Sequence, residues 1–279
     1  MLAFLNGGFV PEERAVISIF DRGFLYGDGL FETIRVFNGR PFRWRRHMAR
    51  LGAGARFLRI KLPYSSNQLE AIADKLIARN KRPNSLLRIA LSRGIGAPGY
   101  LPKNGGNPTL VMSQRPAPKL DPKHMPQWKL FTASYRAAAN DPLAHFKTSN
   151  KLLQVLARTE AARAGADEAL LLNTKGFIAE AAGSNVFWVN GGELYTPPFT
   201  AGVLPGVTRE LVFEIAADLD IPIHQKNARL EALRRTDGIF LSLTSWGIVE
   251  VTLLDGKRVK RAGMTKRIQR AYVEMIGSM

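Results

Sequence analysis

The chain has 279 residues, of which 46% are hydrophobic and 23% charged, a balance typical of a globular protein and not of a disordered or fibrous chain. It carries 40 lysine and arginine residues against 23 acidic residues, and the formal net charge of +17 attracts anions such as nucleic acids, membrane surfaces and phosphorylated or carboxylated small molecules. The absence of cysteine excludes disulfides and thiolate chemistry, and four widely separated histidines predict no metal site.

The first ten residues do not resemble a signal peptide, because Asn6-Gly7-Gly8 interrupts them and no basic residue precedes an apolar core. Elsewhere no apolar run approaches the roughly 18 residues that a membrane-spanning helix needs. We therefore expect a cytoplasmic protein without a membrane partner. The length suits two domains of modest size.

The first part of the chain is predicted to contain both strands and helices. Runs rich in β-branched and aromatic residues, several of them bounded by Asn-Gly turns, predict strands. Apolar residues that recur every three or four positions predict helices. The predicted strands span residues 2–5, 9–10, 31–37, 86–91 and 109–112, and the predicted helices span residues 45–58 and 69–77.

Four prolines between residues 115 and 126 predict a linker, since proline interrupts both helix and sheet. We expect an N-terminal α/β domain over residues 1–114 and a C-terminal domain over residues 127–279. In the second domain, predicted strands span 129–134, 169–172, 177–178, 185–189 and 239–243, and predicted helices span 152–159 and 211–219. The first of these helices stops before Gly165, and the second follows Pro205-Gly206. The fold class is mixed α/β.

Several short motifs, each present once, follow one another in a specific order along nearly the whole chain. They are Asp21-Arg22-Gly23, Tyr26-Gly27-Asp28-Gly29, His47-Met48-Ala49-Arg50-Leu51, Lys147-Thr148-Ser149-Asn150, Glu180, Gly183-Ser184-Asn185-Val186-Phe187, Leu204-Pro205-Gly206-Val207-Thr208-Arg209 and Thr244. Together they resemble the class IV (fold type IV) pyridoxal-phosphate enzymes, which include branched-chain aminotransferases, D-amino acid aminotransferases and aminodeoxychorismate lyases. The resemblance implies a small N-terminal α/β domain and a larger cofactor-binding domain with a mixed sheet or barrel core.

The resemblance implies that pyridoxal 5′-phosphate is bound as a Schiff base to Lys147, which also moves the proton between the substrate's α-carbon and the cofactor. That role needs an amine that is neutral near pH 7, and burial or positive neighbours favour this state. At the family's spacing, Glu180 faces the pyridine nitrogen and keeps it protonated, so that the ring draws electrons from the α-carbon.

Other motif residues correspond to positions that hold the rest of the cofactor. Arg50 matches the family's phosphate-binding arginine, and Gly206, Val207 and Thr208 open a predicted helix whose free N–H groups suit an anion. The resemblance further implies a hydroxyl contact from Thr244 and ring packing by Leu204. Branched-chain aminotransferases usually have a tyrosine four residues after the lysine. This chain has Lys151 there, whose ammonium suits the cofactor's phenolate oxygen.

Five residues correspond to the substrate side of the site: Phe31, Arg88, Tyr100, Ser245 and Trp246. Arg88 suits a substrate carboxylate, and the indole of Trp246 narrows the pocket. The well-known D-amino acid aminotransferases have an arginine and a histidine where Pro98 and Tyr100 stand here, so their carboxylate trap is absent. Residues 28–33 and 92–100 are similar to the aminodeoxychorismate lyase pattern.

The resemblance therefore predicts a homodimeric aminotransferase that moves an amino group between an amino acid donor and a 2-keto acid acceptor. A 4-amino-4-deoxychorismate lyase is the first alternative, because both reactions begin when Lys147 removes a proton from the carbon that bears the amino group. A nucleic-acid-binding protein is a distant alternative. The basic clusters at residues 43–46 and 257–261 lack interleaved aromatic residues for base stacking, and we expect no nucleic-acid partner.

Overall fold

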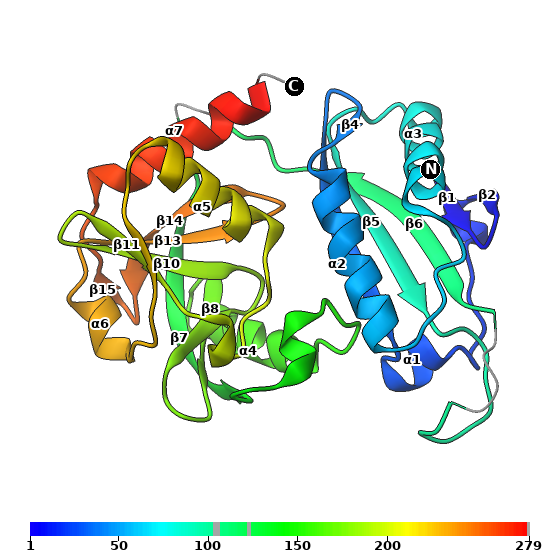
Figure 1. Ribbon diagram of the computed structural model, residues 1–279, viewed down its shortest axis with the longest axis horizontal. Coiled ribbons are helices and arrows are strands. Elements are labelled where there is room, and N and C mark those ends of the chain that lie inside the picture. The colour runs from blue at the N-terminus through cyan, green and yellow to red at the C-terminus, as the bar shows by residue number, and fades with distance from the viewer. Residues whose placement is uncertain (103–106, 122–123, 278–279) are drawn as a thin grey trace. The chain divides into compact units, whose positions relative to one another are not determined.

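The computed structural model describes residues 1–102, 107–121 and 124–277. These residues form two compact units (Figure 1). The first unit combines residues 1–118 with the short segment 146–150, and the second combines residues 119–145 with those from 151 onward. No helix within the described ranges is long and apolar enough to cross a membrane.

The first unit is built on an antiparallel sheet, six-stranded within the described residues, in the order β2-β1-β6-β5-β3-β4. Its strands are β1 (Leu2–Leu5), β2 (Gly8–Pro11), β3 (Gly29–Phe37), β4 (Arg40–Pro41), β5 (Ser85–Ser92) and β6 (Thr109–Pro116). Its helices are η1 (Glu12–Arg14), α1 (Arg22–Tyr26), α2 (Trp44–Phe57) and α3 (Ser66–Asn80).

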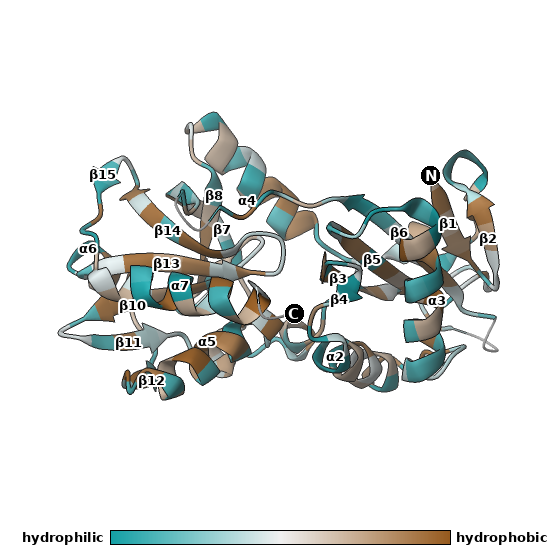
Figure 2. Ribbon diagram, turned by 90° about the horizontal axis from the view of Figure 1, so that it is seen from above, coloured by the Kyte–Doolittle hydropathy of each residue, from teal (hydrophilic) through white to brown (hydrophobic). Residues whose placement is uncertain are grey.

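Helices α2 and α3 cover one face of this sheet (Figure 2) and enclose an apolar core. The strands alternate as their sequences predict, so that Leu87, Ile89 and Leu91 of β5 point into the core. Helix α3 begins at a capping box in which the Ser65 side chain accepts the N–H of Gln68 and the Gln68 side chain accepts the N–H of Ser65. This layer fixes β3 and β5, whose side chains form part of the candidate site.

The second unit contains a mixed sheet, nine-stranded within the described residues, in the order β12-β11-β10-β13-β14-β7-β8-β9, with β15 paired to β14. Its strands are β7 (Gln127–Ala137), β8 (Glu168–Asn173), β9 (Ile178–Ala181), β10 (Asn185–Asn190), β11 (Glu193–Thr196), β12 (Ile223–Gln225), β13 (Gly238–Leu243), β14 (Gly247–Leu254) and β15 (Lys257–Arg258). Its helices are η2 (Pro142–His145), α4 (Leu152–Arg163), η3 (Phe199–Ala201), α5 (Val207–Asp218), α6 (Leu230–Arg234) and α7 (Gly263–Gly277).

Buried aromatic residues connect the helices of the second unit to its sheet. The rings of Phe187 and Phe240, on adjacent strands, stack with centroids 4.9 Å apart, and Phe213 of α5 contacts Phe187. Tyr272 of α7 is fully buried against Gly247, which has a φ of +69°; a side chain there would collide with the tyrosine ring. The sheet and these helices thus form a second core, separate from that of the first unit.

The structure confirms the mixed α/β fold class and most predicted elements, but β14 and α7 were not predicted and several elements, among them β7 and α3, are longer than predicted. Strand β6 continues past Met112 to Pro116, because the whole of β5 pairs with it. The strand predicted at 177–178 lies at Ile178–Ala181. The predicted division at residues 115–126 places residues 146–150 in the second domain, whereas in the structure they pack with the first unit.

Candidate active site

The segment that carries Lys147 lies along the start of β3. The N–H of Phe31 donates to the carbonyl oxygen of Lys147 at 2.9 Å, and the N–H of Ser149 donates to the carbonyl of Gly29 at 2.8 Å. Between these bonds, Thr148 forms a β-bridge with Leu30. The backbone of Lys147 is therefore fixed as firmly as a short edge strand, although it is distant in sequence from β3.

Phe31 brings together two of the predicted cationic side chains. The Nζ atom of Lys147 lies 4.7 Å from the centre of the Phe31 ring, and the guanidinium carbon of Arg88 lies 3.9 Å from it. Arg88 comes from β5, two residues before the partner of Phe31 in the strand register. Both contacts are within the range of cation–π attraction. Lys147, Phe31 and Arg88 thus form one group on the first unit.

Arg50 is held by a carboxylate that the sequence analysis did not select. Its Nε and Nη2 atoms each donate to one oxygen of Glu32 at 2.7 Å, and His47 Nδ1 lies 2.7 Å from Oε2 of the same carboxylate. The Glu32 side chain is 0% exposed. Its position on the inward face of β3, between the apolar Leu30 and Ile34, is the sequence signal for a buried and paired acid.

The charge state of this cluster follows from its surroundings. Burial alone raises the pKa of Glu32, but the hydrogen bonds from Arg50 and His47 outweigh burial and lower that pKa to about 2. Burial lowers the pKa of His47 from its ordinary value. Because an ionised carboxylate only accepts hydrogen bonds, Nδ1 of His47 carries the hydrogen between the two groups. Arg50 therefore projects from a rigid, buried anchor.

Tyr100 lies on a loop that the buried side chain of Arg22 fixes. Arg22 donates to the carbonyl oxygens of Ala97, Gly99 and Tyr100 at 3.1, 2.8 and 3.2 Å, and to Asp28 at 3.0 Å. The Tyr100 ring packs edge-on against Tyr26 and is 90% exposed. The structure therefore does not bring Tyr100 into the Phe31 group of the same chain.

Glu180 lies on β9 in the second unit, where two donors hold its carboxylate. The backbone N–H of Leu204 donates to Oε2 at 2.9 Å, and the side-chain amide of Asn185 donates to the same oxygen at 3.2 Å. The Asn185 amide also donates to the carbonyl of Leu204 at 3.0 Å. Asn185 is a second residue that the sequence analysis quoted without a role, and it joins Glu180 to the segment before α5.

Helix α5 begins directly after that segment. Gly206 is the N-cap residue, and a glycine has no side chain with which to cap the helix. The first helical residues, Val207 and Thr208, are buried. A methyl group at Gly206 would collide with Oδ1 of Asn185, so the close approach requires glycine. The helix start thus offers backbone N–H groups next to the Glu180 network.

The remaining predicted residues also belong to the second unit. Thr244, Ser245 and Trp246 form the turn between β13 and β14. The Trp246 indole packs against Trp128 with ring centroids 6.0 Å apart, beside the apolar core. Lys151 is the N-cap residue of α4, and it belongs to a different unit from Lys147.

The family model for amino-transferase class IV matches residues 29–254. The chain belongs to the class IV aminotransferase family. The match includes Lys147, the Glu32 cluster and the Glu180 network. The class IV family consists of pyridoxal-phosphate enzymes, and its members similar to this chain include aminotransferases and an aminodeoxychorismate lyase.

Comparisons with individual class IV proteins cover nearly the whole chain. The branched-chain-amino-acid aminotransferase of Escherichia coli (strain K12) is 32% identical over 280 residues, 96% of this chain and 91% of its own length. A crystal structure of Escherichia coli branched-chain amino acid aminotransferase has a TM-score of 0.92 at 31% identity and covers 99% of this chain and 94% of its own. The aminodeoxychorismate lyase of Bacillus subtilis (strain 168) is 31% identical over 91% of this chain and 87% of its own length.

A further solved structure contains a cofactor derivative. It is a T.th. branched-chain amino acid aminotransferase complexed with N-(5′-phosphopyridoxyl)-L-glutamate, with a TM-score of 0.91, 28% identity, and coverage of 99% of this chain and 94% of its own. The fold and the family are therefore those that the motifs predicted.

Proposed function

We propose that the chain binds pyridoxal 5′-phosphate and transfers an amino group from an amino acid to a 2-keto acid. The observation that carries this proposal is the Glu180 network. A carboxylate is held by the Leu204 N–H and by Asn185 immediately before a helix start whose N-cap residue, Gly206, has no side chain to cap the first N–H groups. A pyridine ring that bears a phosphate needs an acid and an anion site of this kind.

The side chains present fit that cofactor chemically. The first unit supplies a primary amine from Lys147 and a fixed guanidinium from Arg50, and the second supplies the carboxylate of Glu180 and the N–H groups of Val207 and Thr208. Bound pyridoxal phosphate provides an aldehyde that captures an amino group and a ring that withdraws electrons from the neighbouring carbon.

Each residue then has a defined task. The Nζ atom of Lys147 removes the proton from the α-carbon of the amino donor, which is general base catalysis. Glu180 holds a proton at the pyridine nitrogen. Arg50 and the N–H groups of α5 would bind the phosphate, the hydroxyl of Thr244 would be a further donor, and Leu204 would pack on the ring. The Lys151 ammonium would pair with the phenolate oxygen.

On the substrate side, Arg88 and Phe31 support recognition of an α-amino acid. A guanidinium binds a carboxylate with two parallel hydrogen bonds, and Phe31 offers an apolar surface next to it. We place Ser245 and Trp246 at the substrate as well, whereas the exposed Tyr100 lies outside the Phe31 group of its own chain. Branched-chain amino acids are the first donors to examine, because the E. coli and T.th. relatives are branched-chain aminotransferases.

Lyase activity on 4-amino-4-deoxychorismate is the second candidate. It is supported by the B. subtilis relative and by the lysine at position 151, where branched-chain enzymes usually have tyrosine. The two reactions share proton removal by Lys147. In transamination the donor then leaves as a 2-keto acid and its amino group stays behind, whereas in the lyase reaction 4-amino-4-deoxychorismate loses its enolpyruvyl group as pyruvate and the ring that remains is p-aminobenzoate.

A paired assay distinguishes the two activities. We expect the purified holoprotein to be yellow and to convert L-leucine and 2-oxoglutarate faster than it releases p-aminobenzoate from 4-amino-4-deoxychorismate. D-alanine with 2-oxoglutarate serves as the stereochemical control. Faster p-aminobenzoate release than any transamination would assign the lyase. Protein that stays colourless with added pyridoxal phosphate would refute the cofactor proposal.

We also propose a homodimer, supported by an exposed apolar surface on the first unit. Its large side chains come from two neighbouring segments that Arg22 joins: Val16, Ile17, Ile19, Phe20, Phe24, Leu25, Ile95, Tyr100 and Leu101. Such contiguous patches are typical of interfaces. We expect light scattering to give twice the chain mass of 30.9 kDa, and a stable monomer would contradict the dimer. A cytoplasmic location stays a prediction.

A further inference from the structure

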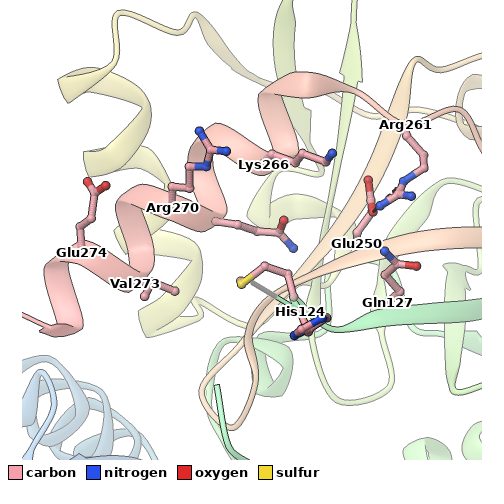
Figure 3. A pocket seen from close by; sticks show the side chains of 10 residues that line it. His124, Gln127, Glu250, Arg261, Lys266, Arg270, Val273 and Glu274 are labelled. Carbon is pink, nitrogen blue, oxygen red and sulfur yellow. Dashed lines mark hydrogen bonds and ion pairs between the residues drawn. The ribbon is translucent and has the colours of Figure 1, made fainter. Parts of the chain in front are cut away.

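A cavity of about 660 Å³ lies in the second unit and shares no lining residue with the candidate active site (Figure 3). One face of α7 forms one wall, and residues around the start of β7 and the middle of β14 form the others. Its volume is within the range of small-molecule sites. The lining residues that carry the argument are Glu250, Arg261, Lys266, Gln269 and Arg270.

The rim of the cavity is cationic. Lys266 and Arg270 are one helical turn apart on α7, so both side chains lie on the same face, and both are exposed. Within the described part of the chain, neither cation has an acidic partner at ion-pairing distance. In the same described part of the chain, Glu274, one turn beyond Arg270, forms no ion pair with either of them. Two such cations on one helical face attract a multiply charged anion.

The floor of the cavity is polar and buried. Glu250 is 3% exposed, and its Oε2 accepts two hydrogen bonds from Arg261 at 3.0 and 2.5 Å. Its other oxygen, Oε1, is buried without a hydrogen-bond partner among the described residues. Gln269, 2% exposed, lies beside it and donates to the carbonyl of Ile248. A buried carboxylate oxygen of this kind calls for a donor.

We propose that this cavity binds an organic phosphate that also carries an N–H or O–H donor. The phosphate pairs with Lys266 and Arg270, since arginine binds phosphate with parallel hydrogen bonds and lysine binds it as a point charge. The donor group reaches Oε1 of Glu250. Inorganic phosphate can pair only with Lys266 and Arg270 at the rim. The buried carboxylate of Glu250 therefore provides selectivity for the organic molecule.

The test must separate this site from two other sources of phosphate binding. The holoprotein is saturated with pyridoxal phosphate so that the active site is occupied, and the excess is then removed by gel filtration, because free cofactor is itself an organic phosphate with an O–H donor. The net charge of +17 attracts anions to the whole surface, and a matched charge removal controls for it. Arg267 suits this purpose because it lies on α7 next to Lys266, outside the cavity lining, and donates to the carbonyl of Leu219.

We would titrate AMP, glucose 6-phosphate and inorganic phosphate by calorimetry at physiological salt. The expected result is one saturable site per chain for at least one organic phosphate, at least about tenfold tighter than inorganic phosphate. Arg270→Ala weakens it about tenfold, a loss of one charge-assisted hydrogen-bonded contact, while Arg267→Ala leaves it unchanged. Glu250→Met weakens the binding of the organic phosphate and leaves the affinity for inorganic phosphate unchanged.

Three results would overturn the proposal. One is that neither AMP nor glucose 6-phosphate binds saturably. The second is an equal effect of Arg270→Ala and Arg267→Ala, which would assign the binding to the general charge of the surface. The third is equal affinity for organic and inorganic phosphate. Arg270 is exposed, so its variant tests the site even if Glu250→Met, in a buried position, fails to fold.

Discussion

Replacing Lys147 by alanine is expected to lower kcat for transamination by on the order of 10⁴-fold, because the variant lacks the base that removes the α-proton. The fold should survive, since the segment is held through backbone bonds to Gly29 and Phe31. Stopped-flow measurement of the half-reaction with the amino donor gives the rate. Lys175→Ala, at an exposed turn of the second unit, is the matched control and should retain full activity.

Chemical mapping provides an independent test of the same residue. Borohydride reduction of the holoprotein followed by peptide mapping should attach the cofactor to the peptide that contains Lys147. Attachment at Lys151, which differs from Lys147 in belonging to the second unit, would transfer the role to the other lysine. Turnover by Lys147→Ala at the wild-type rate would show that Lys147 is not the base.

Replacing Glu32 by glutamine should produce the largest loss of stability of any single change at the site. Glutamine keeps the shape but leaves the guanidinium of Arg50 and the buried ring of His47 without their carboxylate, and breaking a buried ion pair in this way costs about 3–5 kcal/mol. Urea unfolding followed by circular dichroism measures the change. Glu13→Gln, on the exposed surface of the same unit, should leave the unfolding midpoint unchanged.

The same cluster should make unfolding depend on pH. The folded pKa of Glu32 is about 2, below the ordinary value of 4.5, so its contribution is complete above pH 4.5 and is lost as the pH falls toward 2. The folded pKa of His47 lies below its ordinary value of 6.5, so protonation begins to favour unfolding as the pH falls below 6.5. Glu32→Gln should remove the first of these two dependences, and an unchanged acid profile would contradict the assignment.

Glu32→Gln should also weaken cofactor binding if Arg50 holds the phosphate. The variant frees the guanidinium from its anchor, so the loss of affinity reflects orientation and not the loss of a charge. Equilibrium dialysis of pyridoxal phosphate would measure it. Wild-type affinity in a folded Glu32→Gln protein would show that Arg50 needs no such support.

Local patterns predicted much of the fold. The helical spacing of Met48, Leu51 and Ala55 placed α2 within one residue of its observed ends, and Pro205-Gly206 marked the start of α5. These signals are local, because they depend on the periodicity and capping of one segment. The return of residues 146–150 to the first unit is a long-range pairing with β3, and nothing in their own sequence encodes it.

The candidate site was predictable only in part for a similar reason. Motif order indicated Lys147, Arg50 and Glu180, but the groups that orient them come from other elements. Glu32 reaches Arg50 from a neighbouring strand, and Asn185 reaches Glu180 across a tight turn. Such partners become visible only when the register of the strands and the packing of α2 on the sheet are known.

The hydrogen bonds from Arg22 to the loop at residues 97–100 affect how the sequence of this loop can evolve. Its guanidinium binds main-chain oxygens at positions 97, 99 and 100, and the side chains at those positions take no part in these bonds. Gly99 has a φ of +100° and has to stay glycine, but mutations at positions 97 and 100 can change the exposed side chains while the backbone of the loop keeps its course. Natural selection can therefore change the side chains of this surface one residue at a time, without a prior change in the backbone that carries them.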